Sequence, residues 1–169
     1  MNARCATVFA TFVATVLLLS TVGGATPHYI WNTSTSVPIG LYRLQPATQL
    51  VVTELVAVQP PGLLAAFLDL NGYLPVGVPM LKRVLALPGQ TVCRNGLTIA
   101  VDGSDVGQAH ERDGRGRPLP AWHGCRVIAD ADVFVMNWQS TDSLDGRYFG
   151  PLPASAVIGR AIPIWTDEE

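Results

Sequence analysis

One lysine stands apart from the other charged residues of this 169-residue chain. Ten of the eleven basic side chains are arginine, and the single lysine, Lys82, lies within a mostly apolar run at positions 79–87. Partial desolvation of an amine in such a run disfavours its charged form and lowers its pKa toward neutrality, as a general base requires. Arginine cannot take this role because it stays protonated at working pH. Composition alone also allows Lys82 to extend from a strand edge into water.

A general base needs a nucleophile, and a hydroxyl-rich loop at positions 32–36 supplies candidates. Ser34 and Ser36 lie in this loop, and Pro38 and Gly40, which follow directly, are expected to hold it rigid. Taken alone, the same hydroxyls are typical of a turn. The separation of Ser36 from Lys82 excludes the S-x-x-K helical arrangement, so any dyad must form between distant segments.

Other catalytic chemistries have weaker support. The three histidines, His28, His110 and His123, lie in no recognisable catalytic context, and the sequence has no G-x-S-x-G motif. The cysteine spacing and the nearby histidines do not indicate a metal site, and no cofactor is expected. The formal charge of -2, the pI near 5.9 and the scattered arginines argue against a nucleic-acid partner.

The N-terminal part of the chain has the character of a membrane-targeting segment. Arg4 precedes a run at positions 6–22 that contains no charged residue, Gly or Pro. This run is at the lower limit for crossing a bilayer, so residues 1–25 are predicted to be an anchor, with a signal cleaved near 23–25 as the alternative. Arg4 should stay on the cytoplasmic side, which places residues 26–169 outside the cytoplasm as one domain.

Cysteine usage agrees with an exported domain. Cys93 and Cys125 lie in the exported part, whereas Cys5 lies at the cytoplasmic edge of the apolar run. A disulfide between the first two would close a loop of about 30 residues and stabilise the fold by about 3 to 4 kcal/mol in the loop-entropy model. Two buried free thiols are the alternative.

The elements that must position these groups are mostly strands. Short runs of β-branched and aliphatic residues alternate with turn residues, and one run, 63–70, is predicted to be a short helix that ends at Asn71 and Gly72. This helix is apolar nearly all round, so it should pack or contact a membrane. Residues 26–38 are expected to form an irregular loop and 102–120 a mobile surface loop. The expected strands are 50–52, 55–58, 80–87, 133–136 and 157–165, with a hairpin at 90–101. A mainly β fold with one short helix follows.

Four segments follow one another along the chain: Ser36-Val37-Pro38, 81–89, 142–151 and 157–161. In this order they resemble the sequence boxes of the signal peptidase I family, and most closely those of its TraF-type branch, the conjugal-transfer peptidases. The resemblance runs from about Trp31 to Trp165. The resemblance implies an antiparallel β fold of the signal-peptidase type. It also implies Ser/Lys chemistry, in which a neutral lysine takes the serine proton and an acyl-enzyme forms and is hydrolysed.

The resemblance also implies roles for individual hydroxyls and for the lysine. Ser36 matches the nucleophile and Lys82 the general base. Ser34 matches the side-chain donor of the oxyanion hole, where the backbone N–H of Ser36 would join it. Ser143 matches the hydroxyl that orients the lysine amine.

Two charged residues match the acidic and basic positions of the 142–151 box. Asp145 stands where TraF-type enzymes need an aspartate, and Arg147 follows two residues later. Asp145 is interpreted as an organiser of the site, acting through Arg147 or through backbone groups, and not as a proton carrier. A plain salt bridge between the two residues is the alternative.

Departures from the housekeeping signal peptidases guide the substrate prediction. Those enzymes have one more residue between serine and proline, an aspartate where Gln90 stands, and Gly-Asp-Asn in place of residues 136–138. The Ser-x-Pro-x-Gly-x-Tyr pattern, the stretch 116–120 and the paired cysteines are TraF-like instead. The resemblance thus implies a bacterial inner-membrane peptidase, facing the periplasm, that cuts a conjugative pilin precursor with hydrolysis or cyclisation. A general signal peptidase acting on exported preproteins and a non-catalytic periplasmic binding module of a transfer apparatus are the alternatives.

Overall fold

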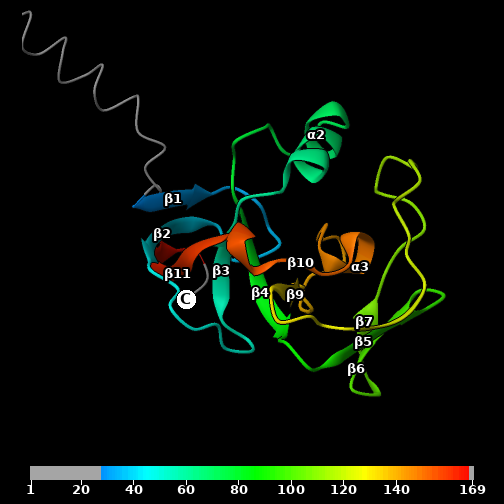
Figure 1. Ribbon diagram of the computed structural model, residues 1–169. Helices are drawn as coiled ribbons and strands as arrows, with labels where there is room; N and C mark the ends of the chain where they lie inside the picture. The colour runs from blue at the N-terminus through cyan, green and yellow to red at the C-terminus, as the bar shows by residue number, and fades with distance from the viewer. Residues whose placement is uncertain (1–27, 168–169) are drawn as a thin grey trace, which may run out of the picture.

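Two antiparallel sheets make up most of the computed structural model, which describes residues 28–167 (Figure 1). The larger sheet has the strand order β1-β2-β11-β3-β4-β9-β10, and the smaller sheet has the order β7-β6-β5-β8. The larger sheet contains β1 (Tyr29–Asn32), β2 (Gly40–Gln45), β3 (Leu55–Val58), β4 (Met80–Ala86), β9 (Asp132–Val135), β10 (Leu152–Pro153) and β11 (Val157–Thr166). The smaller sheet contains β5 (Thr91–Asn95), β6 (Thr98–Val101), β7 (Ser104–Gln108) and β8 (Gly124–Val127). The predicted mainly β, antiparallel fold is confirmed.

Strand β4 runs between β3 and β9 and links the parts of the core. Its residues Leu81, Val84 and Ala86 are buried, and each belongs to a different hydrophobic cluster. A strand that is covered on both faces reads as a nearly continuous apolar run, because it has no side that water can reach. Lys82 is the buried polar residue of this strand, whereas its neighbour Arg83 is partly exposed.

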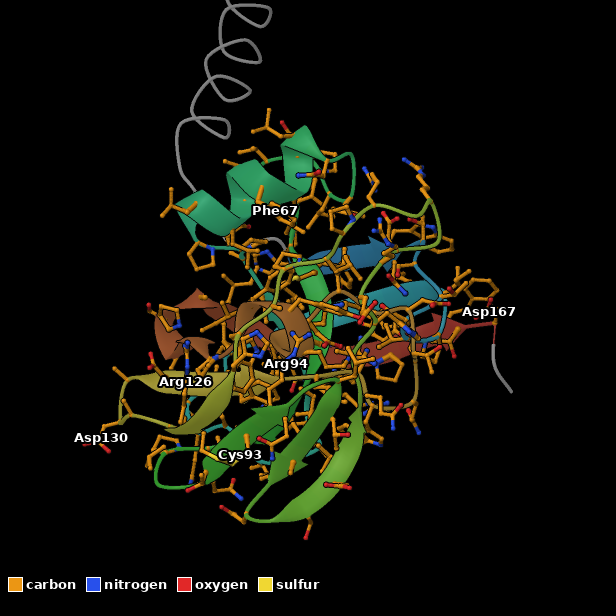
Figure 2. All side chains as sticks on the ribbon, turned by 90° about the vertical axis from the view of Figure 1, so that its right-hand side faces the viewer. Phe67, Cys93, Arg94, Arg126, Asp130 and Asp167 are labelled. Atoms are coloured by element: carbon orange, nitrogen blue, oxygen red, sulfur yellow. A yellow bond between two sulfur atoms is a disulfide. The ribbon has the colours of Figure 1, made fainter. Side chains whose placement is uncertain are left out.

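The smaller sheet carries the predicted disulfide. Cys93 on β5 and Cys125 on β8 are directly opposite each other in the antiparallel register, and their sulfur atoms are bonded. Figure 2 shows Cys93 and the helix residue Phe67 at opposite ends of the view, so this bond stabilises the part of the molecule far from the helix. The disulfide predicted from the sequence is present.

The predicted helix is present as α2 (Gly62–Leu70), in which Ala65 and Leu68 face the protein. A second helix, α3 (Gly146–Phe149), and a 3₁₀ turn, η1 (Ala154–Ala156), were not predicted, because segments this short show no helical periodicity. No helix within residues 28–167 has the length and apolar character needed to cross a membrane. The predicted anchor at 1–25 lies outside the described residues.

Three expectations about irregular segments and strands were wrong. Within the expected loop 26–38, β1 forms because its residues pair with β2 and Trp31 stacks on Trp165 at a ring distance of 5.7 Å. Residues 50–52 are not a strand, because the chain turns there and Thr53 takes a φ of 75°. Within the expected loop 102–120, β7 pairs with β6 as a polar edge strand, which hydrophobic alternation does not reveal.

Candidate active site

Ser36 lies in the loop between β1 and β2, and the buried side chain of Asn32 shapes this loop. The Asn32 Oδ1 accepts a hydrogen bond from the Ser34 N–H at 3.2 Å. Its Nδ2 donates at 2.7, 3.1 and 3.0 Å to the carbonyl groups of Ser34, Val37 and Pro38. One side chain therefore satisfies four backbone groups, which gives the serine loop a defined shape without regular secondary structure.

The hydroxyl groups of Ser34 and Ser36 contact each other. Ser34 Oγ donates to Ser36 Oγ at 3.0 Å, and the backbone N–H of Ser36 donates to Ser34 Oγ at 3.3 Å. Both contacts are exposed and the N–H contact is long, so a bound carbonyl oxygen can replace them at small cost. The Ser34 hydroxyl and the Ser36 N–H could then both donate to an oxyanion on the carbon attacked by Ser36.

Lys82 is 5% exposed, and its Nζ donates to Ser143 Oγ at 2.8 Å. Burial lowers the pKa of Lys82 from 10.5 to about 8; the nearby Asp145 carboxylate acts in the opposite direction and the Arg147 guanidinium in the same direction. An amine with this pKa is half neutral at about pH 8 and can accept a proton under ordinary conditions.

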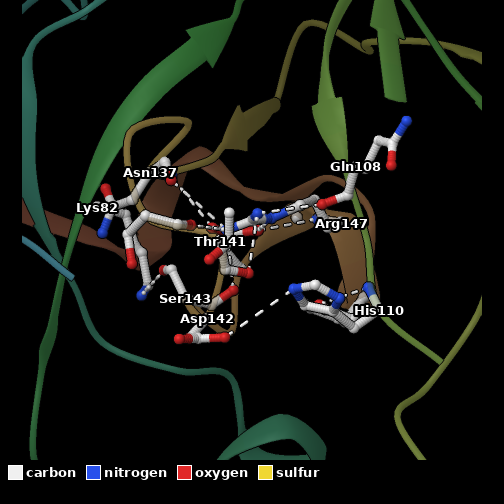
Figure 3. Close-up of polar contacts among 12 residues, drawn as sticks. Lys82, Gln108, His110, Asn137, Thr141, Asp142, Ser143 and Arg147 are labelled. Carbon is white, nitrogen blue, oxygen red and sulfur yellow. Dashed lines mark hydrogen bonds and ion pairs between the residues drawn. The ribbon is translucent and has the colours of Figure 1, made fainter. Parts of the chain in front are cut away.

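Asp145 and Arg147 form a buried ion pair. Figure 3 shows the Arg147 side chain with its dashed bonds, and the Lys82 and Ser143 side chains nearby. The Arg147 Nε and Nη2 each donate to the Asp145 carboxylate at 2.9 Å, and both residues are no more than 1% exposed. Asp145 also accepts from the backbone N–H groups of Arg147 and Asn137, so it caps α3. Its bonds run to Arg147 and to backbone N–H groups.

Arg147 holds the loop that carries Ser143. Its guanidinium donates hydrogen bonds to five backbone carbonyl groups, those of Gln108, Asn137, Ser140, Thr141 and Ser143. These bonds provide the buried guanidinium with acceptors and hold the backbone of the loop close to it. The position of the Ser143 hydroxyl, and through it the direction of the Lys82 amine, therefore depends on Arg147.

Asn137 was not predicted to be a site residue, yet its side chain bonds to the backbone on both sides of Lys82. Its Nδ2 donates to the carbonyl of Leu81 at 3.1 Å, and its Oδ1 accepts from the N–H of Arg83 at 2.9 Å. These two residues flank Lys82 in β4. The side chain of Asn137 thus bonds to one C=O and one N–H of β4, as a neighbouring strand would, and fixes the backbone that carries Lys82.

A pocket of about 470 Å³ is lined by the candidate catalytic residues. Ser34, Ser36, Lys82 and Ser143 all line it, whereas Asp145 and Arg147 do not. Within residues 28–167 no hydrogen bond joins Ser36 Oγ to Lys82 Nζ; catalytic contacts of this kind are often long before substrate binds. No group of three or more potential metal ligands occurs among the described residues.

Comparison of this chain with known proteins identifies its family. A model described as signal peptidase, peptidase S26, matches residues 2–166, nearly the whole chain. The chain belongs to the signal peptidase S26 family. Membership in this family supports the prediction that the protein is a peptidase.

Relatives within the S26 family include proteins named for plasmid transfer. The conjugal transfer protein TraF of Agrobacterium fabrum (strain C58) is 34% identical, with 98% of each chain aligned. A plasmid transfer protein TraF of Escherichia coli is 32% identical over 80% of this chain and 81% of the relative. A probable signal peptidase I-1 of Synechocystis sp. (strain PCC 6803) is 33% identical over 66% of this chain and 52% of the relative. A signal peptidase I crystal structure from Enterococcus faecalis V583 covers 67% of this chain and 97% of its own at a TM-score of 0.40 and 16% identity.

The two asparagines are the residues that the sequence did not reveal. Asn32 directly precedes the hydroxyl-rich loop, and Asn137 stands in the segment where this chain departs from the housekeeping Gly-Asp-Asn pattern. An asparagine beside a candidate nucleophile or at the start of a motif is a weak signal that a side chain supports the backbone there.

Proposed function

We propose that this S26 family member is a membrane-bound serine endopeptidase in which Ser36 is the nucleophile and Lys82 the general base. The observation that carries the proposal is the Lys82 amine, buried and with a pKa of about 8, in the same pocket as the paired hydroxyls of Ser34 and Ser36. A buried lysine without a carboxylate bonded to it costs stability, and that cost is unexplained unless the neutral amine has a use.

The reaction follows from these positions. Neutral Lys82 takes the proton of Ser36 as Oγ bonds to the scissile carbonyl carbon, and the oxyanion receives hydrogen bonds from Ser34 Oγ and the Ser36 N–H. The C–N bond breaks as Lys82 returns the proton to the leaving amine, which leaves an ester on Ser36. Water then attacks the ester while Lys82 accepts its proton. The C–O bond to Ser36 breaks as Lys82 returns this proton to Oγ, which releases the carboxyl product and restores both groups. Ser143 accepts a hydrogen bond from the amine throughout and directs its lone pair.

The substrate proposed is a conjugative pilin precursor. Two relatives carry names that refer to conjugal or plasmid transfer, and one of them aligns over 98% of this chain. In this proposal residues 1–25 anchor the protein in the bacterial inner membrane, and residues 26–169 face the periplasm, where the precursor emerges. Attack on the ester by the substrate's own N-terminal amine in place of water would give a cyclic product, one water molecule lighter than the hydrolysed one.

Purified full-length protein in detergent should cleave the pilin precursor and should be acylated at Ser36 by a penem. Ser36→Ala and Lys82→Arg should each abolish both reactions. Ser36→Ala should keep the melting temperature within a few degrees, whereas Lys82→Arg buries a permanently charged group and should lower it. Ser104→Ala, a serine on the edge strand β7 outside the pocket, is the matched control and should retain wild-type rates. Wild-type activity in Lys82→Arg would exclude the dyad.

A general signal peptidase is the second candidate, because the Synechocystis relative bears that name. Cleavage rates for an exported preprotein and for the pilin precursor, measured side by side, distinguish the two. Faster cleavage of the preprotein would favour the general enzyme. A protein that binds the precursor but neither cleaves it nor reacts with the penem would instead be a non-catalytic module.

A further inference from the structure

The segment 109–120 follows β7, and its two ends are fixed beside the 142–151 box. At its start the His110 N–H donates to the Tyr148 hydroxyl at 3.0 Å. Just beyond its end the Trp122 Nε1 donates to the Gly146 carbonyl at 3.0 Å. In Figure 1 the segment extends from β7 to the level of α2. Its base is therefore tied to the elements that hold Ser143.

The tip of the segment contacts Tyr73 and Asn71, which follow α2. The Tyr73 hydroxyl donates to Asp113 Oδ2 at 2.7 Å, and Arg117 Nη1 donates to the Asn71 carbonyl at 2.6 Å. The Arg117 guanidinium also lies over the Tyr73 ring at 4.4 Å. Tyr73 and its neighbour Leu74 line the same pocket as Ser36 and Lys82. The segment thus joins two walls that are far apart in the sequence.

The tip has a rigid internal structure of its own. Asp113 pairs with Arg117 at 2.7 Å and accepts from the backbone N–H groups of Arg115 and Arg117. A bridge between Arg112 and Pro118 closes the turn. The hydrogen bond from Tyr73 also holds the pKa of Asp113 well below its ordinary range, which means that this carboxylate stays charged and keeps its partners. These contacts do not support the mobility expected for 102–120.

We propose that residues 109–120 form a clamp in which Asp113 and Arg117 act as positioning residues that hold Tyr73 as a wall of the peptide-binding pocket. The clamp fixes the distance between the Tyr73 wall and the loop of Ser143, and so determines how well a peptide binds. This inference deepens the proposed function and rests on it for the class of ligand, a peptide.

The clamp can be tested by peptide binding in a form that cannot turn over. The probe is a fluorescein-labelled peptide spanning the cleavage region of the pilin precursor, titrated with full-length Ser36→Ala protein and read by anisotropy. Adding Asp113→Ala or Tyr73→Phe should raise Kd about 3- to 10-fold, the range expected for loss of one ordinary intramolecular hydrogen bond. Because Asp113→Ala already removes the Tyr73 bond together with the Arg117 pair, adding Tyr73→Phe to it should weaken binding no further.

Glu111→Gln is the matched control, since it removes one carboxylate from the same exposed segment and should leave Kd unchanged. In the protein with Ser36 intact, Tyr73→Phe should raise KM for the peptide several-fold and leave kcat and the rate of penem acylation near wild type. An unchanged Kd in Tyr73→Phe, or equal loss of penem acylation and peptide binding, would overturn the clamp. If the wild type does not react with the penem but Tyr73→Phe still raises the Kd for the peptide, the proposed dyad fails and the clamp stands.

Discussion

The pH dependence of Ser36 acylation is the sharpest test of the proposed base. With a pKa of about 8, Lys82 is neutral in about one tenth of molecules at pH 7. At the ordinary pKa of 10.5 the neutral fraction would be about 300-fold smaller. Acylation limited by the neutral amine should therefore rise about tenfold from pH 6 to pH 7, reach half of its maximum near pH 8 and level off above pH 9.

The assay is the second-order rate of penem acylation of full-length protein in detergent, followed by mass spectrometry at constant ionic strength. Working with subsaturating penem reports the free enzyme, so the half-maximum corresponds to the unliganded site. Lys82→Arg should give no measurable acylation at any pH, because arginine stays protonated throughout.

Three outcomes would refute the reasoning. A half-maximum near pH 6.5 would indicate that a histidine is the base. A half-maximum near pH 10.5 would show that burial does not perturb the lysine. A flat profile between pH 6 and 9 would mean that no group titrating in this range controls the nucleophile.

Further predictions concern stability and are measured by urea unfolding. Lys82→Met should abolish activity and stabilise the fold by about 1 to 3 kcal/mol at pH 7, because it removes a buried amine. The gain should shrink between pH 8 and 10.5, where the unfolded wild type binds more protons than the folded form, so wild-type stability rises with pH. Gly146→Ala should destabilise by about 1 to 3 kcal/mol, because its Cβ would lie 2.6 Å from the Phe134 ring. Cys93→Ser should cost about 3 to 4 kcal/mol, and dithiothreitol should cost the wild type a similar amount.

Each of these predictions has a control. Gly62→Ala, where a Cβ would meet nothing within 4 Å, should leave stability nearly unchanged, and equal losses at both glycines would contradict the packing explanation. No stabilisation in Lys82→Met at pH 7 would mean that the amine is not destabilising in the fold. A reductant that does not alter the stability of the wild type would show that the Cys93 bond contributes nothing.

The parts of the fold that the sequence predicts best are those where one local pattern decides the outcome. β4 is apolar because it is covered on both faces, and this same pattern made its lysine conspicuous. The order of the motifs indicated Ser36. By contrast, β1 depends on a distant partner, Trp165, and β7 is a polar edge strand whose pairing with the adjacent β6 leaves no apolar alternation to read.

The supporting residues of the site were harder to predict because their bonds are long-range. Asn137 holds the backbone of Leu81, 56 positions away, so nothing in its neighbourhood signals the role. The link from Tyr73 to Asp113 spans 40 positions and joins a helix end to a segment that composition marks as a surface loop. Composition describes how polar a segment is, but tertiary hydrogen bonds decide whether it is ordered.

The placement of Lys82 also makes the chain a reporter of its own unfolding. A lysine-specific endoprotease finds one cleavage site in the whole sequence, and that site lies in β4 between two neighbouring strands. The protease cannot bind this backbone until the sheet separates, so fraying of the ends or opening of the loops leaves the chain intact. When opening and closing are fast relative to cleavage, the rate at which the two fragments appear measures the population of the open form.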